Sequence, residues 1–150
     1  MTQASTFIHL LRHSVPQDVH EGNATQMNLQ IPLADEAVTI ALGTRIAPLL
    51  RKGDVIALKG DLGAGKSTFA RAVIRALVGA DTDVPSPTFT IVQTYEAPDL
   101  PIWHFDLYRL EHPDELRELG MEDTIDGLAL IEWPERMGDA MPRNRLELSL

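Results

Sequence analysis

The chain has 150 residues, a formal net charge of −9 and no cysteine. This length suits one domain, and a hydrophobic content of 44% is enough to build a core. The composition excludes disulfides, thiolate metal sites and cysteine nucleophiles, and the acidic balance argues against a stand-alone RNA-binding protein, because contacts with the phosphate backbone depend on Lys and Arg.

Residues 1–25 are polar and rich in turn-forming residues, and we expect a poorly ordered N-terminal extension there. The spacing of His9 and His13 would place two metal ligands on one face of a helix, but no carboxylate or cysteine motif completes such a site. The apolar patch at 7–11 is not preceded by a basic residue, as a signal peptide would require. No apolar run approaches the ~20 residues that span a bilayer, so the sequence favours the cytosol.

Residues 26–150 are expected to form a single domain of alternating strands and helices. The stretch 27–31 alternates apolar and polar residues, which predicts a short half-buried strand. Asp35 occupies an N-cap position before a helical apolar pattern that Pro48 ends or distorts. Residues 55–58 form an apolar run that is typical of a strand buried on both faces, as in a parallel sheet.

The second half of the chain continues this alternation. An apolar stripe predicts a helix that ends at Gly79, and a short helix is expected over 113–119, with Pro in its first turn. Further strands are predicted over 89–95, 102–105, 128–131 and 145–150. The pattern indicates an α/β fold with a mixed, mostly parallel sheet, helices on both faces and antiparallel strands near an edge.

The strongest motif is Gly60-Asp61-Leu62-Gly63-Ala64-Gly65-Lys66-Ser67, which matches the P-loop pattern G-x-x-x-x-G-K-[ST]. In this motif the backbone N–H groups point at phosphate oxygens, Lys66 reaches the β- and γ-phosphates, and the Ser67 hydroxyl ligates Mg²⁺. A predicted strand precedes the motif and a predicted helix follows it, so the helix dipole faces the phosphates. A flexible glycine-rich turn would not need this placement. We therefore predict a three-layer sandwich of the P-loop NTPase type.

Two carboxylates follow buried strands directly. Asp106 ends the strand over 102–105, and Glu132 ends the strand over 128–131. Both therefore lie at carboxyl ends of strands, where ligands bind in open α/β sheets. One is expected to hold Mg²⁺, directly or through water, and the other to polarise the attacking water. Their spacing does not assign the two roles, and for one of them a solvated position past the strand is an alternative.

Three more features have two interpretations each. Ser86-Pro87-Thr88 is either a switch segment that meets the metal or the γ-phosphate, or an ordinary Ser-Pro turn. Trp133 packs near the nucleotide or in the core. Arg109 is a phosphate-binding cation or one half of a surface ion pair.

These motifs together resemble the TsaE (YjeE) family. The matching blocks are GDLGAGKST at 60–68, SPTFTIV at 86–92, HFDLYRL at 104–110, ELRELG at 115–120 and IEWPER at 131–136. Ser67 stands where the family has Thr and keeps the hydroxyl, and the segment at 35–43, with Thr39, fits the family's first helix. The resemblance covers residues 29–150. The extension has no clear family equivalent, and many relatives continue with further β structure after the strand at 145–150.

The resemblance implies a protein that binds and slowly hydrolyses ATP. Such proteins support the TsaD and TsaB proteins, which make the threonylcarbamoyl modification on adenosine 37 of tRNA, so tRNA is met only through the complex. By position in the family's motifs, Ser67 and Glu132 are Mg²⁺ ligands, and Lys66 and Asp106 are catalytic. The implied nucleotide-binding residues are Thr39, Leu62, Gly63, Ala64, Gly65, Lys66, Ser67, Thr68, Thr88 and Trp133.

Other functions of a P-loop remain as alternatives. A small-molecule kinase usually has an arginine-rich lid, but Arg117 is the only basic residue between Pro113 and Gly127. A GTPase would carry an Asn-Lys-x-Asp motif, which is absent from the sequence. A binding module whose partner affinity depends on bound ATP, without significant turnover, stays open.

Overall fold

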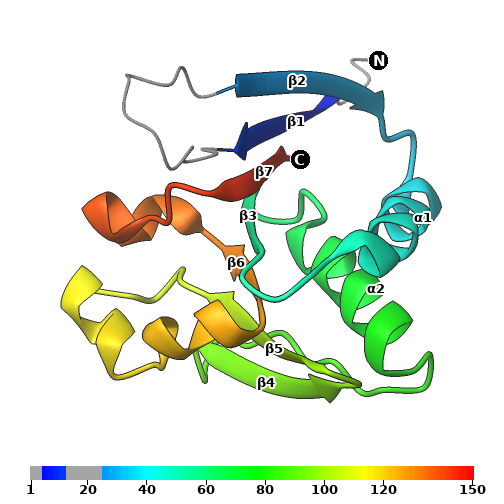
Figure 1. Cartoon of the computed structure of the whole chain (residues 1–150). Coiled ribbons are helices and arrows are strands. Elements are labelled where there is room, and N and C mark those ends of the chain that lie inside the picture. The colour runs from blue at the N-terminus through cyan, green and yellow to red at the C-terminus, as the bar shows by residue number, and fades with distance from the viewer. Residues whose placement is uncertain (1–4, 13–24) are drawn as a thin grey trace, which may run out of the picture.

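The computed structural model describes residues 5–12 and 25–150, and its strands form one seven-stranded sheet of order β2-β1-β7-β3-β6-β5-β4. Figure 1 shows the sheet edge-on, with β2 and β4 at its two edges. The strands are β1 (Ser5–Arg12), β2 (Thr25–Pro32), β3 (Val55–Lys59), β4 (Val92–Ala97), β5 (Leu100–Asp106), β6 (Leu128–Glu132) and β7 (Arg145–Ser149).

Strand direction changes from the centre of the sheet to its edges. The central neighbours β7, β3, β6 and β5 are parallel to one another. β4 is antiparallel to β5, and β1 is antiparallel to both β7 and β2. Among the described strands only β1 and β4 therefore run against the others, which confirms the mixed, mostly parallel sheet with antiparallel strands near its edges.

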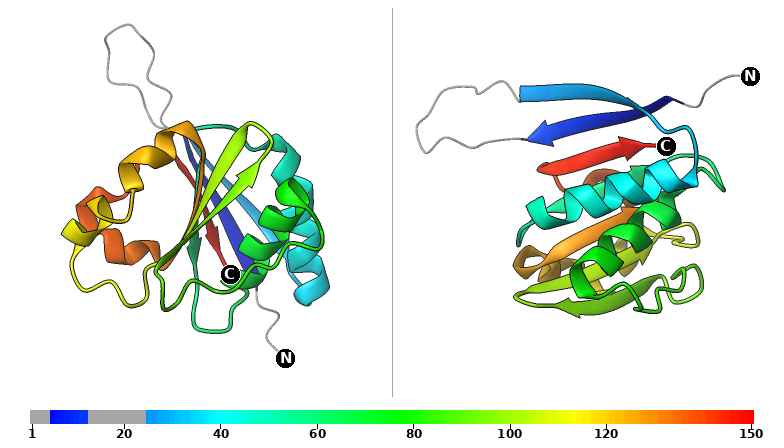
Figure 2. Two further views of the ribbon diagram at one scale, coloured as in Figure 1. Left: turned by 90° about the horizontal axis from the view of Figure 1, so that it is seen from below. Right: turned by 90° about the vertical axis from the view of Figure 1, so that its right-hand side faces the viewer.

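Helices lie on both faces of the sheet, as predicted. The α-helices α1 (Glu36–Ile46) and α2 (Lys66–Val78) cover one face, and short 3₁₀ helices cover the other (Figure 2). The 3₁₀ helices on that second face are Pro113–Arg117, Met121–Asp126 and Pro134–Ala140. The helix expected over 113–119 is thus a shorter 3₁₀ helix, and a further 3₁₀ turn, Ala47–Leu49, follows α1.

The core lies on both sides of the central strands. In β6, Leu128 and Leu130 pack in the cluster that includes Phe69 of α2, whereas Ala129 and Ile131 pack in the cluster on the 3₁₀ side. All four of these strand residues are fully buried. Burial on both faces explains why the strand is uninterruptedly apolar, and each large side chain removed from water contributes about 1.5–3 kcal/mol before entropic costs.

The two α-helices pack closely because one position lacks a side chain. Asp35 caps α1 by accepting a hydrogen bond from the N–H of Val38 at 2.9 Å. Further along α1, Gly43 faces α2. A Cβ on Gly43 would lie 2.9 Å from the Cβ of Ala72 and 3.0 Å from the carbonyl oxygen of Phe69. α1 therefore rests directly on the backbone of α2, the helix that follows the P-loop motif.

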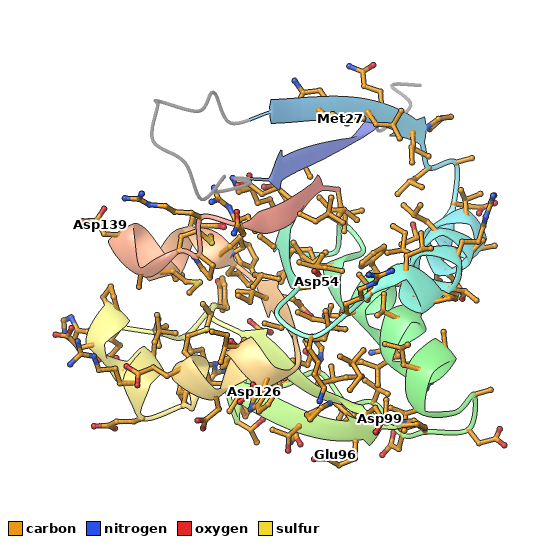
Figure 3. All side chains as sticks on the ribbon, viewed as in Figure 1. Met27, Asp54, Glu96, Asp99, Asp126 and Asp139 are labelled. Atoms are coloured by element: carbon orange, nitrogen blue, oxygen red, sulfur yellow. The ribbon has the colours of Figure 1, made fainter. Side chains whose placement is uncertain are left out.

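Two predicted strands differ in detail. The strand expected over 89–95 begins only at Val92, because residues 87–90 form a turn that Ile91 closes with a left-handed φ of 67°. β2 is an edge strand rather than a half-buried one: Met27 and Leu29 are 61% and 58% exposed, and Figure 3 shows Met27 at the outer edge of the sheet. Local composition indicated strand in both places, but the tertiary neighbours decide where pairing and burial occur.

The N-terminal extension differs from expectation in one part. Residues 5–12, which include the apolar patch, form β1 between β2 and β7. His9 lies in this strand, so the helical pairing with His13 does not apply; His13, with residues 1–4 and 13–24, lies outside the described residues. Within the described ranges, no helix has both the length and the apolar character needed to cross a membrane.

Candidate functional site

The loop between β3 and α2 has a backbone that glycine makes possible. Gly60, Gly63 and Gly65 have φ values of 142°, 81° and 109°, a region that residues with a Cβ rarely adopt. Gly65 is the N-cap of α2 and makes no side-chain cap. The N–H groups of the first turn of α2 therefore remain available to an anion, with the positive end of the helix dipole behind them.

This loop borders a cavity of about 220 Å³ in which five segments meet. The segments are the loop, the start of α2, the 86–88 turn and the carboxyl ends of β5 and β6. The cavity is lined by Leu62, Gly63, Gly65, Lys66, Ser67, Thr68, Ser86, Thr88, Asp106, Glu132 and Trp133. The structure thus brings together both carboxylates and most of the residues that the motifs singled out.

Two predicted nucleotide-binding residues lie outside that lining. Thr39 of α1 is buried behind the loop, with its methyl group 3.8 Å from the place of a Cβ on Gly65. Ala64 is exposed on the loop, where its N–H donates to the carbonyl of Asp61 at 3.0 Å. Thr39 supports the loop from behind, and the side chain of Ala64 does not border the cavity.

Lys66 is a buried cation without a carboxylate partner in the described part of the chain. Its Nζ donates to the carbonyl oxygens of Gly60 at 2.6 Å and Asp61 at 2.8 Å. It also lies 4.1 Å from the ring centroid of Trp133, within cation–π range. The ammonium group is faced by two carbonyl oxygens and an aromatic ring, and none of these carries a negative charge. The positive charge of Lys66 is therefore available to an anion that enters the cavity.

Glu132 ends β6 and is 2% exposed. Both of its carboxylate oxygens lie 3.0 Å from the Ser67 hydroxyl, and Oε1 also lies 2.7 Å from Nε2 of His104. A hydroxyl and a carboxylate are the oxygen ligands that Mg²⁺ prefers. No cluster of three or more potential His, Cys, Asp or Glu ligands occurs among residues 5–12 and 25–150, so a metal ion here would share its coordination with phosphate or water oxygens.

Asp106 ends β5, is 4% exposed and is paired in register with Glu132. Its Oδ2 accepts a hydrogen bond from the Thr88 hydroxyl at 3.0 Å, and its Oδ1 accepts one from the N–H of Tyr108 at 3.1 Å. The Ser86 hydroxyl lies 2.9 Å from that of Thr88. Ser86 lies just before the 87–90 turn, and Thr88 of that turn contacts Asp106 while Ser86 contacts Thr88; a switch role for this segment stays a prediction.

Trp133 has a left-handed backbone, with φ of 57° and ψ of 50°. This conformation is an outlier for a bulky residue and costs of order 1–3 kcal/mol. The ring lies between Lys66 and the ring of Tyr108, whose centroid is 5.0 Å away, and it packs against the core cluster on the 3₁₀ side. Trp133 therefore joins the core and also borders the cavity, and its contact with a nucleotide stays a prediction.

Arg109 forms no ion pair with the described residues, and its role as a phosphate-binding cation stays a prediction. Its guanidinium group lies 4.3 Å from the ring centroid of Phe89, a side chain that is 79% exposed. Arg109 is not part of the lining formed by the described residues. The 86–92 segment thus contacts the 104–110 segment through the side chains of Thr88 and Asp106 and of Phe89 and Arg109, in addition to the backbone bond from the Asp106 N–H to the Ile91 carbonyl.

Sequence reasoning missed the contact between His104 and Glu132. The signal lay in the alternation of β5, where Ile102, His104 and Asp106 share one face. Ile102 belongs to the core cluster beneath α2. A polar residue between an apolar core position and a strand-end carboxylate indicates a side chain that serves the site.

A second cavity, of about 240 Å³, adjoins the first through a shared residue. It lies between α1 and α2, and Thr68 lines both cavities. Its lining consists of Glu36, Ile40, Thr44, Thr68, Arg71, Ala72, Arg75, Ala76 and Ala80.

Comparisons with known proteins agree over most of the chain. The family model described as "Threonylcarbamoyl adenosine biosynthesis protein TsaE" matches residues 33–150. A tRNA threonylcarbamoyladenosine biosynthesis protein TsaE from Rickettsia bellii is 40% identical over 125 residues, which are 83% of this chain and 87% of the relative. The protein of the same name from Bacillus subtilis is 39% identical over 112 residues, 73% of this chain and 69% of the relative.

A solved structure has a similar fold. The crystal structure of Bacillus subtilis YdiB superposes with a TM-score of 0.63 at 31% sequence identity. The superposition covers 78% of this chain and 72% of that structure.

Proposed function

The chain belongs to the TsaE family of tRNA threonylcarbamoyladenosine biosynthesis, as its motifs predicted, and we propose that it is an Mg²⁺-dependent ATPase that supports this modification. The observation that carries the proposal is the cavity itself. Within it, the uncompensated Lys66 ammonium group, the open first turn of α2 and two strand-end carboxylates face one space. This combination suits the phosphates and metal of a nucleoside triphosphate.

Lys66 would bind the β- and γ-phosphates. Without nucleotide its Nζ donates to two loop carbonyls, and these neutral partners can be exchanged for charged phosphate oxygens, which form stronger hydrogen bonds. As charge develops on the transferred group, the same ammonium would stabilise it.

Ser67 and Glu132 fit the role of Mg²⁺ ligands, because both offer oxygen and already lie in contact with each other. Bound Mg²⁺ would supply charge neutralisation on the β- and γ-phosphate oxygens. Asp106 would orient the attacking water and accept its proton. Its link to Thr88 suits this role, because a turn next to the phosphates can respond to what is bound.

The nucleoside would extend past Thr68 into the second cavity. Thr68 lies at the junction of the two cavities, and the exposed side of α1 contributes Glu36 and Ile40 to the lining. Thr39, one turn away and buried, would act on the base only through these neighbours. Substituting Ala76 with Trp should fill this cavity and weaken ATP binding while leaving pyrophosphate binding unchanged; equal losses for both would place the nucleoside elsewhere.

The partners and location of the protein are part of the proposal. TsaD and TsaB are the proteins with which the family's role would be carried out, in the cytosol, and tRNA would be held by that complex. The net charge of −9 supports an indirect contact with tRNA, because an acidic protein repels the phosphate backbone.

Calorimetric titration tests the proposed activity. We expect ATP to bind more tightly than GTP, and more tightly with Mg²⁺ than with EDTA, and we expect slow release of phosphate from ATP. Preference for guanine nucleotides, or no gain from Mg²⁺, would contradict the proposal. Turnover measured with and without the TsaD–TsaB pair separates an ATPase from a module that responds to ATP by binding alone.

A further inference from the structure

We propose that His104 is a positioning residue that fixes which oxygen of Glu132 is available to the metal ion. The inference rests on the proposed Mg²⁺–ATP function. His104 lies in the middle of β5 and is 1% exposed, and its Nε2 lies 2.7 Å from Oε1 of Glu132. It belongs to neither the P-loop nor the cavity lining.

The hydrogen-bond pattern determines the tautomer of the ring. The Ser67 hydroxyl lies 3.0 Å from both oxygens of Glu132 and shares its one proton between them, and an ionised carboxylate has no proton to donate. Nε2 of His104 must therefore be the donor in its bond to Oε1. Nδ1 is buried without a hydrogen-bond partner among the described residues, and a bare acceptor there is less costly than a buried, unpaired N–H⁺. Nε2 thus carries the proton of the bond to Oε1.

The acceptor count then separates the two oxygens of Glu132. Each carboxylate oxygen has two acceptor positions. Oε1 accepts from His104 and shares the single Ser67 proton with Oε2, whereas Oε2 has no other donor and so keeps more free acceptor capacity. The remaining capacity lies on Oε2, which also contacts the hydroxyl expected to bind the metal. His104 thereby presents one defined oxygen, as partners of metal ligands do elsewhere.

A purely structural role explains the residue less well. A histidine that only filled space at this place would leave a buried nitrogen unpaired for no gain, and an apolar residue would continue the face that Ile102 begins. The polar contact of His104 is to Glu132 alone among the described side chains. Its effect on function should therefore pass through that carboxylate.

The test compares His104→Leu with His104→Gln. Leucine fills the space without a donor, whereas the glutamine amide nitrogen reaches about as far as Nε2 and keeps one. The measured quantity is the gain in ATP affinity that Mg²⁺ provides, taken as the ratio of Kd in EDTA to Kd in Mg²⁺. We expect this gain to fall about tenfold or more in His104→Leu and to stay within about threefold of wild type in His104→Gln. Affinity in EDTA should change by no more than about twofold in either variant.

A double-mutant cycle makes the test specific. In a Glu132→Ala background, His104→Leu should not reduce the Mg²⁺-dependent gain any further, because the group it positions is gone. Thermal unfolding without nucleotide shows whether the variants are folded. If His104→Leu does not fold, His104→Asn takes its place. Its amide is too short to reach Oε1, so it should lose the Mg²⁺-dependent gain as well.

Several outcomes would overturn the inference. A folded His104→Leu protein that keeps the full Mg²⁺-dependent gain shows that His104 does not position Glu132. Equal losses in EDTA and in Mg²⁺ show that it acts on the fold. If wild-type protein itself gains nothing from Mg²⁺, the proposed function fails first, so the two failures are distinguishable.

Discussion

Two carboxylates end neighbouring parallel strands in matched register, yet their surroundings differ. Glu132 is held by side chains from regular elements, namely Ser67 of α2 and His104 of β5. Asp106 is held by Thr88, which belongs to a turn, and by the backbone N–H of Tyr108 just beyond its own strand. A group fixed by regular elements suits a metal ion that demands near-ideal geometry. A group tied to a turn suits the hydrolysis step, in which the attacking water moves towards the phosphate. This difference supports the proposal that Glu132 would bind the metal ion and Asp106 would orient the attacking water.

The largest effect is expected from Lys66, which borders the same cavity as both carboxylates. Lys66→Ala should lower single-turnover ATP hydrolysis by about 10²- to 10³-fold, because a preorganised positive charge at the developing negative charge is lost. Lys52→Ala, at an exposed turn at the opposite end of β3 from the loop, is the matched control and should leave the rate unchanged. A folded Lys66→Ala protein with full turnover would contradict the assignment of the loop.

Thr88→Val sharpens the comparison because, of the two carboxylates, it releases only Asp106. The substitution keeps the shape of the side chain but removes the hydroxyl that donates to Oδ2. We expect hydrolysis to slow by about tenfold, the value of about one hydrogen bond, with Mg²⁺–ATP affinity within about twofold. Ser86→Ala, which loses a contact to Thr88 but none to Asp106, should have a smaller effect. If Thr88→Val instead removes the Mg²⁺ dependence of binding, the two carboxylates have been assigned the wrong way round.

Glu147 of β7 is a third buried carboxylate, and its substitution is expected to have the smallest effect on function. Burial raises its pKa, but hydrogen bonds from Lys59 and Arg145, with their positive charges, outweigh burial and hold the pKa below its usual range. Because the folded-state pKa is the lower one, the ionised group stabilises the fold above the unfolded pKa, and this contribution is lost as pH falls through the folded pKa.

We therefore expect Glu147→Gln to lower the free energy of unfolding by about 1–2 kcal/mol at pH 7. The difference from wild type should shrink below the ordinary glutamate pKa of about 4.3. Urea denaturation at several pH values measures this, and Mg²⁺–ATP affinity at pH 7 should stay unchanged within about twofold. A stability difference that is independent of pH would show that the ion pairs contribute nothing.

Features that depend on local sequence could be predicted, and features that depend on pairing between distant segments could not. The P-loop motif, the Asp35 cap and the strand ends at Asp106 and Glu132 follow from residue spacing alone. The alternation of β5 places His104 on the face of Asp106, but its contact with Glu132 also requires the register between β5 and β6, which no local pattern contains. The same holds for β1, because its place depends on the edge that β7 offers at the other end of the chain.

The 89–91 segment shows a local preference that the tertiary structure overrides. Its composition favours a strand, but Ile91 adopts a left-handed φ and its N–H donates to the Pro87 carbonyl at 2.6 Å. This turn brings Thr88 to Asp106. The departure from a strand thus occurs at the site, where function outweighs propensity.

The most direct test measures ATP affinity with and without Mg²⁺, together with single-turnover hydrolysis, in Glu132→Ala and Asp106→Ala. We expect Glu132→Ala to lose most of the Mg²⁺-dependent gain in affinity, about 10- to 100-fold. Asp106→Ala should keep that gain and slow hydrolysis instead, because a water-positioning group acts in the transition state and leaves ground-state contacts in place. The reverse pattern would show that Asp106 holds the metal, and no change in either variant would show that these strand ends are not the site.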